Sequence, residues 1–332
     1  PLTQVARAAK RLPAGVRFAL TGTPIENRLS ELWSIFDFLM PGLLGTRESF
    51  AKRFESPVEH AEGDSAARLQ ALVSPFVLRR VKEDVVADLP EKIEDTVMAQ
   101  LTGEQRKLYL ANQDRIAQQV QHREAGEFKK DKLKVLAELT KLRQICCDPR
   151  LHYEDYKAGS AKLDTCMELV HGALDGGHRI LLFSQFTGML DIIGKRLAKE
   201  DIAFLKLTGA SSKESRAKMV AQFQAGEVPV FLISLKAGGV GLNLTAADVV
   251  IHYDPWWNVA AQDQATDRAH RIGQQHTVTV YKLIAKDTIE ERIMQMQESK
   301  RDLVNSVLGG DGISSALFTR EDVLALLGGD GR

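Results

Sequence analysis

The sequence of 332 residues is poor in the residue patterns that mark membrane, disulfide-bonded or metal-binding proteins. No apolar run approaches the roughly 20 residues that are needed to cross a bilayer, so no membrane partner is expected. Its three cysteines are Cys146, Cys147 and Cys166, and an adjacent pair with one distant thiol fits neither a zinc spacing nor a disulfide framework. We therefore expect reduced, buried thiols and no metal ligand within this chain.

The sequence also lacks an excess of charge of either sign, because 44 Lys and Arg balance 44 Asp and Glu. Any contact with nucleic acid must therefore come from a local basic track and not from bulk attraction. Apolar residues make up 44% and charged residues 27%, which is ordinary for soluble globular protein, and the length suggests two domains. The chain starts at Pro1 without an initiator Met, and we expect it to be a piece of a longer protein.

From about residue 160 onward, short apolar segments alternate with amphipathic helical patterns. The strands are expected at Ile180–Phe183, Phe204–Leu207, Val230–Ser234, Val249–Tyr253 and Val278–Leu283. The helical patterns between them cover residues 187–199, 213–225 and 259–270. This alternation predicts an α/β fold with a parallel sheet that helices cover on both faces, and ligands bind such sheets at the carboxyl ends of the strands.

The residues before 160 predict mostly helical structure. The expected elements are a short strand at Val16–Leu20, a helix at Leu29–Leu39 ended by Pro41-Gly42, a loop at 55–67, a helix that starts at the capping box Thr102–Gln105, a break at 122–128, and a second helix from about Asp131. The last two helices would form a helical arm. A second capping box at Thr288–Glu291 opens a helix, and a short helix is expected after Thr319.

The strongest chemical signal is the segment from Gln264 to Gln274, which reads QATDRAHRIGQ. On a continuous helix, Gln264, Arg268 and Arg271 would share one face because they are spaced by four and three residues. Two adjacent guanidinium groups repel each other unless an anion lies close to both, and planar guanidinium groups suit phosphate oxygens. Taken alone, the segment fits a solvated helix face with acidic partners equally well.

A second signal is the segment Val230–Leu244, in which a buried strand leads through a glycine-rich turn into a helix. Such a turn lets backbone amides approach a phosphate closely. Taken alone, a plain tight strand-to-helix turn is the more common explanation.

Together, these two segments resemble the fifth and sixth motifs of superfamily-two helicases of the Swi/Snf type. Further segments match motifs or blocks of that family in family order: Leu20–Asn27, Phe76–Pro90, Ile180–Phe186, Leu207–Gly209 and His252–Asn258. Val259 departs from the pattern, since a proline is common there, and this affects only the local turn. The resemblance extends from about residue 16 to 300.

The resemblance implies two RecA-like lobes that clamp ATP between them. The expected division is the end of lobe one with a helical insertion (1–95), a helical arm (96–155), the RecA-like lobe two (156–308), and a linker with a short helix (309–332). In this family the first lobe carries a Gly-Lys-Ser/Thr phosphate loop and an Asp-Glu pair that serves Mg²⁺, and neither occurs in this sequence. We therefore expect the C-terminal part of an ATP-dependent motor, with the Mg²⁺ ligands on the missing lobe, and no ATP hydrolysis by this chain alone.

The resemblance also assigns roles to individual residues. The catalytic set, in which the arginines act as fingers toward the γ-phosphate, is Gln264, Arg268 and Arg271. The set that lines the nucleotide is Gly239, Gly241 and Asn243. The set that contacts the DNA backbone is Thr21, Gly22, Thr23, Ser184, Gln185, Thr208, Gly209, Ser234 and Lys236. The expected partner is double-stranded DNA without sequence preference, a DNA-bound protein is a further candidate partner, and the chain is expected to be monomeric.

Several other residues allow two explanations. Arg79, Arg80 and Lys82 resemble elements that distinguish this family, whereas the lysines at 129, 130, 132 and 134 fit a solvated surface better than a duplex contact. Trp256 and Trp257 are expected to pack in the core or at a hinge and not to stack on bases, and His252 and His270 are expected to be structural. The rival functions are an RNA helicase and a non-catalytic scaffold with the same fold. The protein would lie in the cytoplasm with the nucleoid if bacterial, or in the nucleus if eukaryotic.

Overall fold

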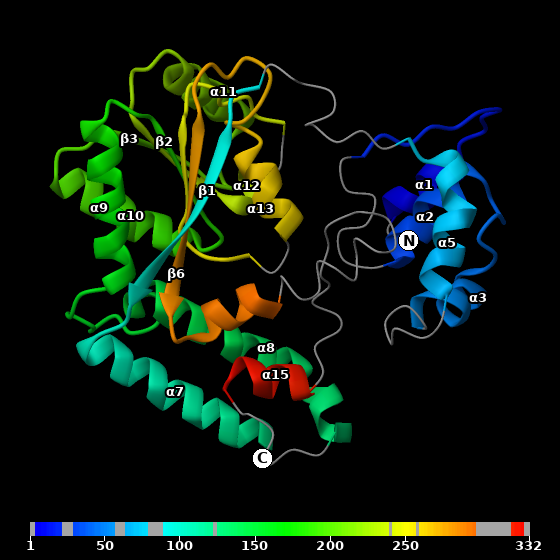
Figure 1. The fold of residues 1–332 in the computed structure, drawn as a ribbon, viewed down its shortest axis with the longest axis horizontal. Helices are drawn as coiled ribbons and strands as arrows, with labels where there is room; N and C mark the ends of the chain where they lie inside the picture. The colour runs from blue at the N-terminus through cyan, green and yellow to red at the C-terminus, as the bar shows by residue number, and fades with distance from the viewer. Residues whose placement is uncertain are drawn as a thin grey trace. The chain divides into compact units, whose positions relative to one another are not determined.

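A computed structural model describes residues 4–21, 29–56, 64–78, 89–121, 125–238, 241–256, 259–296 and 320–328 (Figure 1). The chain divides into two compact units. The first is built mainly from the described residues up to 78, and the second mainly from those after 88. Within the described parts of the chain, no helix is long and apolar enough to cross a membrane, and no cluster of side chains could hold a metal ion.

The second unit is organised around a six-stranded parallel sheet with the order β1-β6-β5-β2-β4-β3. Its strands are β1 (Lys92–Gln100), β2 (Ile180–Ser184), β3 (Phe204–Leu207), β4 (Val230–Ser234), β5 (Val249–His252) and β6 (Val278–Lys286). The five expected strands are confirmed, whereas β1 was missed. The expected boundary between residues 95 and 96 falls inside β1, which pairs with β6 along its whole length.

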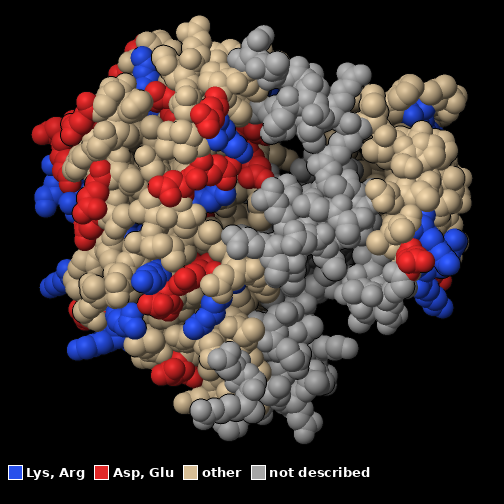
Figure 2. All heavy atoms as spheres, in the orientation of Figure 1, with Lys and Arg blue, Asp and Glu red and all other residues tan. Residues whose placement is uncertain are grey.

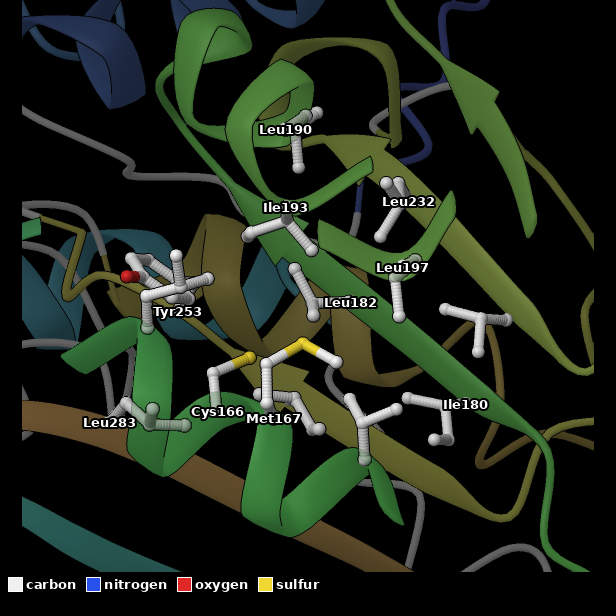
Figure 3. Packing of buried hydrophobic residues seen from close by; sticks show 14 of the residues in the cluster. Cys166, Met167, Ile180, Leu182, Leu190, Ile193, Leu197, Leu232, Tyr253 and Leu283 are labelled. Atoms are coloured by element: carbon white, nitrogen blue, oxygen red, sulfur yellow. The ribbon is translucent and has the colours of Figure 1, made fainter. Parts of the chain in front are cut away.

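Helices cover both faces of this sheet, as expected. The helices are α9 (Ala161–Asp175), α10 (Thr187–Lys199), α11 (Lys213–Gln224), α12 (Leu235–Gly238) and α13 (Val259–Thr266). Alternate residues of β2 enter two different cores, because successive side chains of a strand point to opposite faces. Ile180 and Leu182 pack with α9 and α10, whereas Leu181 and Phe183 pack with residues around α11 and α13. Figure 3 shows Met167 of α9 and Ile193 of α10 close to Leu182.

The helical arm consists of α7 (Gly103–Gln121) and α8 (Ala125–Cys147), followed by the 3₁₀ turn η3 (Pro149–Leu151). The helix start near Thr102 is confirmed, but the side chain of Gln105 does not close a capping box. Its amide donates instead to the carbonyl oxygens of Ile145 and Cys146, at 2.9 and 3.3 Å, and so ties the two helices together. Residues 125–128, expected within a break, are helical, and 122–124 lie outside the described residues.

A short helix, α15 (Arg320–Leu326), follows Thr319 as expected and packs on the arm. Gln113 of α7 donates to the carbonyl oxygen of Leu327 at 2.7 Å, and Arg292 donates to that of Leu326 at 2.9 Å. Cys146, Cys147 and Cys166 are fully buried and form no disulfide, which confirms the expectation of reduced thiols.

The first unit is helical in its described part. It contains α1 (Gln4–Lys10), α2 (Leu29–Leu39), α3 (Arg47–Phe50), the π-helical η1 (Ala51–Glu55), α5 (Ser65–Val73) and the 3₁₀ turn η2 (Ser74–Phe76). Its small core includes Phe36, Phe50 and Leu69. The predicted helix at 29–39 is confirmed, whereas residues 65–67, expected in a loop, belong to α5. The strand expected at Val16–Leu20 is not formed, and Leu20 is fully exposed, because no described strand of this unit offers it hydrogen bonds.

Candidate functional site

The arginine segment does not continue the helix that precedes it. Helix α13 ends at Thr266, so Gln264 lies on the helix while Arg268 and Arg271 lie in the turns that follow. The expected helix over 259–270 is therefore wrong after residue 266, and the three side chains do not share one helix face. The physical reason is a long-range bond, since the backbone N–H of Leu244 donates to the carbonyl oxygen of Arg268 at 2.9 Å and removes it from the helical pattern.

Arg268 and Arg271 are two neighbouring cations that form no ion pair within the described residues. Arg268 is 9% exposed, and its Nε is buried without a hydrogen-bond partner. Burial and the nearby Arg271 lower the pKa of Arg268, although Asp267 acts in the opposite direction. Arg271 is exposed, and its Nη1 donates to the carbonyl oxygen of Leu242 at 3.2 Å. An anion close to both guanidinium groups would relieve their repulsion.

The glycine-rich turn and the arginine segment are in direct contact. Two bonds join them, from the N–H of Leu244 to Arg268 and from the guanidinium of Arg271 to Leu242. Gly241, which adopts a positive φ of 43°, and Asn243 are both exposed beside these contacts. Gly239 lies outside the described residues. The structure therefore brings part of the expected nucleotide-lining set next to the arginine pair.

Gln274, the last residue of the arginine segment, has a role that the sequence did not reveal. Its amide Nε2 donates to the carbonyl oxygens of Ala247 at 2.7 Å, Ala269 at 3.1 Å and Thr245 at 3.2 Å. Its Oε1 accepts hydrogen bonds from two backbone N–H groups, those of residues 275 and 276. Gln274 therefore fixes the arginine segment to the turn that leads into β5. The sequence indicated this role only through the position of Gln274 at the end of the motif.

The residues expected to contact DNA gather at the carboxyl edge of the sheet. Ser184 of β2 lies opposite Ser234 of β4, and Thr208 follows β3. The hydroxyl of Ser184 donates to Asp254 Oδ1 at 2.5 Å, and the N–H of Gln185 donates to Asp254 Oδ2 at 3.3 Å. Asp254, which follows β5 and is buried, is thus a second residue that the sequence did not single out.

These edge residues differ in what they present to solvent. Ser184 and Ser234 are buried, so their side chains do not reach the surface, whereas Gly209 is exposed and Thr208 is half-buried. The Oγ1 of Thr208 accepts the N–H of Ala210 at 3.3 Å, which shapes the turn after β3. Of the remaining expected contacts, Thr21 is exposed in the first unit. Gly22, Thr23 and the side chain of Lys236 lie outside the described residues.

The two histidines of the motifs both contact neighbouring parts of the fold. His252 stacks on Phe183 with 5.5 Å between ring centroids, and its Nε2 lies 2.8 Å from the hydroxyl of Thr266. Burial lowers the pKa of His252 to about 3, so its ring is neutral at pH 7. His270 Nε2 lies 2.7 Å from the carbonyl oxygen of Pro90.

Charged groups are mixed in sign over the described surface of the second unit that Figure 2 shows. Trp256 packs against the core beside α11 and α13. The residues Arg79, Arg80, Lys82 and Trp257 and the side chains of the lysines at 129, 130 and 132 lie outside the described part of the chain, while Lys134 is exposed.

Comparison with known proteins identifies relatives of the whole chain. A model of the SNF2-related domain matches residues 1–151, and one of the helicase conserved C-terminal domain matches residues 161–273. The solved SWI2/SNF2 ATPase core of Sulfolobus solfataricus in complex with dsDNA is 38% identical, with a TM-score of 0.57 over 93% of this chain and 66% of that one. The chain belongs to the Swi/Snf family. Members of this family are ATP-dependent helicases and ATPases, and the parallel sheet described above is their RecA-like fold.

Two curated proteins illustrate the extent of the likeness. An "Uncharacterized ATP-dependent helicase" of Mycoplasma pneumoniae is 40% identical over 98% of this chain and 31% of its own length. The "DNA repair and recombination protein RAD26" of Saccharomyces cerevisiae is 34% identical over 93% of this chain and 30% of its own length. The chain therefore spans about a third of the length of these Swi/Snf relatives.

Proposed function

We propose that this chain is the C-terminal half of an ATP-driven translocase on double-stranded DNA, in which Arg268 and Arg271 act as arginine fingers. The observation that carries the proposal is the pair of adjacent guanidinium groups without a described carboxylate partner, one of them with a buried, unused Nε. A triphosphate supplies the anion that this arrangement lacks. Arginine fingers stabilise the charge that develops on the transferred phosphoryl group and contribute on the order of 10³–10⁵ in rate.

The nucleotide would be ATP with Mg²⁺. Gly241 and Asn243 are exposed beside the arginine pair and would line it, together with Gly239, while Gln264 on α13 would contribute a side-chain amide. The phosphate loop and the acidic pair, neither of which occurs in this sequence, would come from another part of the first lobe. By this proposal, the chain does not hydrolyse ATP unless that part is joined to it or added.

The DNA partner is supported by the dsDNA complex of the Sulfolobus relative and by the carboxyl edge of the sheet. Thr208, Gly209 and Lys236 would contact phosphates, as would Thr21, Gly22 and Thr23 of the first unit. Gln185, whose amide nitrogen is buried, would act through its turn. Ser184 and Ser234 are buried, so they would act through the backbone of their turns. Such contacts position the duplex without reading its sequence, so binding is nonspecific and weakens with salt.

The decisive experiment is Arg271→Ala in the full-length protein, with DNA-stimulated ATPase as the assay. Because Arg271 is exposed, we expect the fold to be retained, duplex affinity to change by less than about threefold, and turnover to fall by about 10³ or more. Arg106→Ala, which removes an exposed arginine from α7, is the matched control and should keep full activity. Normal turnover in the Arg271 variant would refute the assignment.

A non-catalytic scaffold is the alternative with a different outcome in the same assay. If the protein is a scaffold, its unmodified full-length form should bind duplex DNA but show no DNA-stimulated ATPase activity. The arginine pair speaks against it, because two adjacent cations without an ion pair among the described residues repel each other unless an anion binds, and a scaffold needs no such anion.

A further inference from the structure

Arg143 is a buried arginine on the helical arm that reaches the carboxyl edge of the sheet. It lies on α8 and is 1% exposed. Its Nη1 donates to Gln185 Oε1 at 3.2 Å, and its Nη2 donates to the carbonyl oxygen of Pro255. Its guanidinium also lies over the ring of Phe186, 5.7 Å from the centroid. A single side chain of the arm thus contacts both the turn after β2 and the turn after β5.

The same two turns are also joined to each other. Asp254, at the start of the turn after β5, accepts hydrogen bonds from the hydroxyl of Ser184 and the N–H of Gln185. The arm has a further bond beside this point, since the hydroxyl of Tyr253 donates to the carbonyl oxygen of Cys147 at 3.0 Å. The end of α8 and the two turns therefore form one connected network.

Only one of the two polar atoms of the Gln185 side-chain amide forms a hydrogen bond in the described structure. Its Oε1 accepts from Arg143, whereas its Nε2 is buried and has no hydrogen-bond partner in the described structure. A buried donor without an acceptor is costly, so the surrounding structure must hold the amide in this position. Within the described residues, the hydrogen bond that sets its orientation is the one from Arg143.

We propose that Arg143 is a positioning residue for DNA binding, which sets the turns after β2 and β5 in the arrangement that a DNA strand requires. The proposal rests on the proposed function, because it concerns the same carboxyl edge of the sheet. Arg143 does not touch DNA itself, since its guanidinium is buried. Its effect passes through Gln185 and through the carbonyl of Pro255, and it couples the position of the helical arm to that edge.

A double-mutant cycle tests this coupling. Arg143→Met, Gln185→Met and the double variant are made in the full-length protein, and the DNA concentration for half-maximal ATPase stimulation and the duplex Kd are measured for each. We expect each single change to raise both the half-maximal DNA concentration and the duplex Kd by roughly tenfold. The double variant should show values no higher than those of the more strongly affected single variant, because both substitutions break the same Arg143–Gln185 contact. For Arg143→Met, the KM for DNA should change by a larger factor than kcat.

Arg115→Met is the matched control, because it removes another arginine contact of the same arm. Arg115 pairs with Glu138 at 2.5 Å on a partly exposed surface, and its loss should leave the DNA dependence unchanged. Thermal unfolding is followed for every variant. If Arg143→Met does not fold, Arg143→Lys is used in its place. The lysine side chain is shorter and has a single nitrogen, so it should keep the fold but lose either the contact with Gln185 or that with Pro255.

Additive effects in the double variant, or an unchanged DNA dependence in either single variant, would overturn this inference alone. The proposed function fails by a separate result, namely normal turnover of Arg271→Ala. Absence of any duplex binding by the unmodified protein would overturn both.

Discussion

The buried ion pair between Lys162 and Glu290 allows the sharpest stability prediction. Both side chains are fully buried, and Lys162 Nζ lies 2.5 Å from Glu290 Oε2. The same carboxylate oxygen accepts the N–H of Ala285 at 2.8 Å, so the pair ties the first turn of α9 to the end of β6. We predict that Lys162→Met strongly destabilises the second unit, because it leaves the carboxylate of Glu290 buried without its cation.

The expected magnitude follows from the complete burial of both groups. Removing one partner of a buried pair costs about 3–5 kcal/mol. For a unit of this size each kcal/mol lowers Tm by about 2–4 °C, so Tm should fall by about 6–20 °C. The double variant Lys162→Met with Glu290→Gln should recover most of the loss. No charge is then left buried, and the amide oxygen of the substituted glutamine side chain can still accept the N–H of Ala285.

The assay is thermal and urea unfolding at pH 7. Burial lowers the pKa of Lys162, but the interaction with Glu290 outweighs this and raises it overall. A raised lysine pKa means that the contribution to stability is fully present below the ordinary value of 10.5 and is lost only as the pH rises through the folded-state pKa, so pH 7 reports the whole effect.

The control is Lys206→Met, which breaks a pair with Asp191 in which both side chains are at least 40% exposed. Its loss should cost less than about 1 kcal/mol, because solvent screens such a pair. Unfolding of Lys162→Met within about 2 °C of the parent, or a double variant less stable than the single one, would show that the buried pair does not stabilise the second unit.

Two further predictions concern titratable groups. Burial favours a raised pKa for Glu94, but hydrogen bonds from Lys282 and Lys92 lower it to about 2. The stabilisation that this carboxylate provides is therefore present above pH 4.5 and is lost as the pH falls toward 2. In urea unfolding, Glu94→Gln should lower the free energy of unfolding by about 1 kcal/mol at pH 7, after allowance for screening, and by almost nothing near pH 2. Burial also raises the pKa of Cys166 to about 12 and those of the other two thiols further, so a thiol reagent should label none in the native protein and all three in denaturant. Rapid labelling of the native protein would contradict the burial of these thiols.

The central strands could be predicted from the sequence because both of their faces are buried and they read as continuous apolar runs. The strand β1 has the sequence KIEDTVMAQ and lies at the edge of the sheet, where most of its side chains are exposed. Because of its charged residues, β1 lacks the apolar pattern that predicts a strand, and it is identified only by its pairing with β6. The segment Val16–Leu20 shows the opposite case, since its apolar run fits a strand but no described neighbour pairs with it.

The site was located by its motifs, but its geometry could not be predicted from helical spacing. Spacing by four and three residues places Gln264, Arg268 and Arg271 together only if the helix continues, and the backbone of Leu244 ends that pattern from 24 residues away. Burial was equally invisible in the sequence. Ser184 and Ser234 stand at the ends of apolar strands, where the sequence alone allows either an exposed or a buried side chain. Both are buried, and the hydroxyl of Ser184 donates to the buried carboxylate of Asp254.

The bonds around the arginine segment have a mechanical consequence for whatever anion binds there. Its backbone is held by Leu244 at Arg268 and by the amide of Gln274 at Ala269, and the guanidinium of Arg271 holds the carbonyl of Leu242. A shift of the segment would therefore move residues 241–244, of which Gly241 and Asn243 are exposed, and a ligand that displaces these residues would move the arginines with them. Coupling of this kind needs no flexible linker between the two motifs, because one backbone bond and one side-chain bond already join them directly.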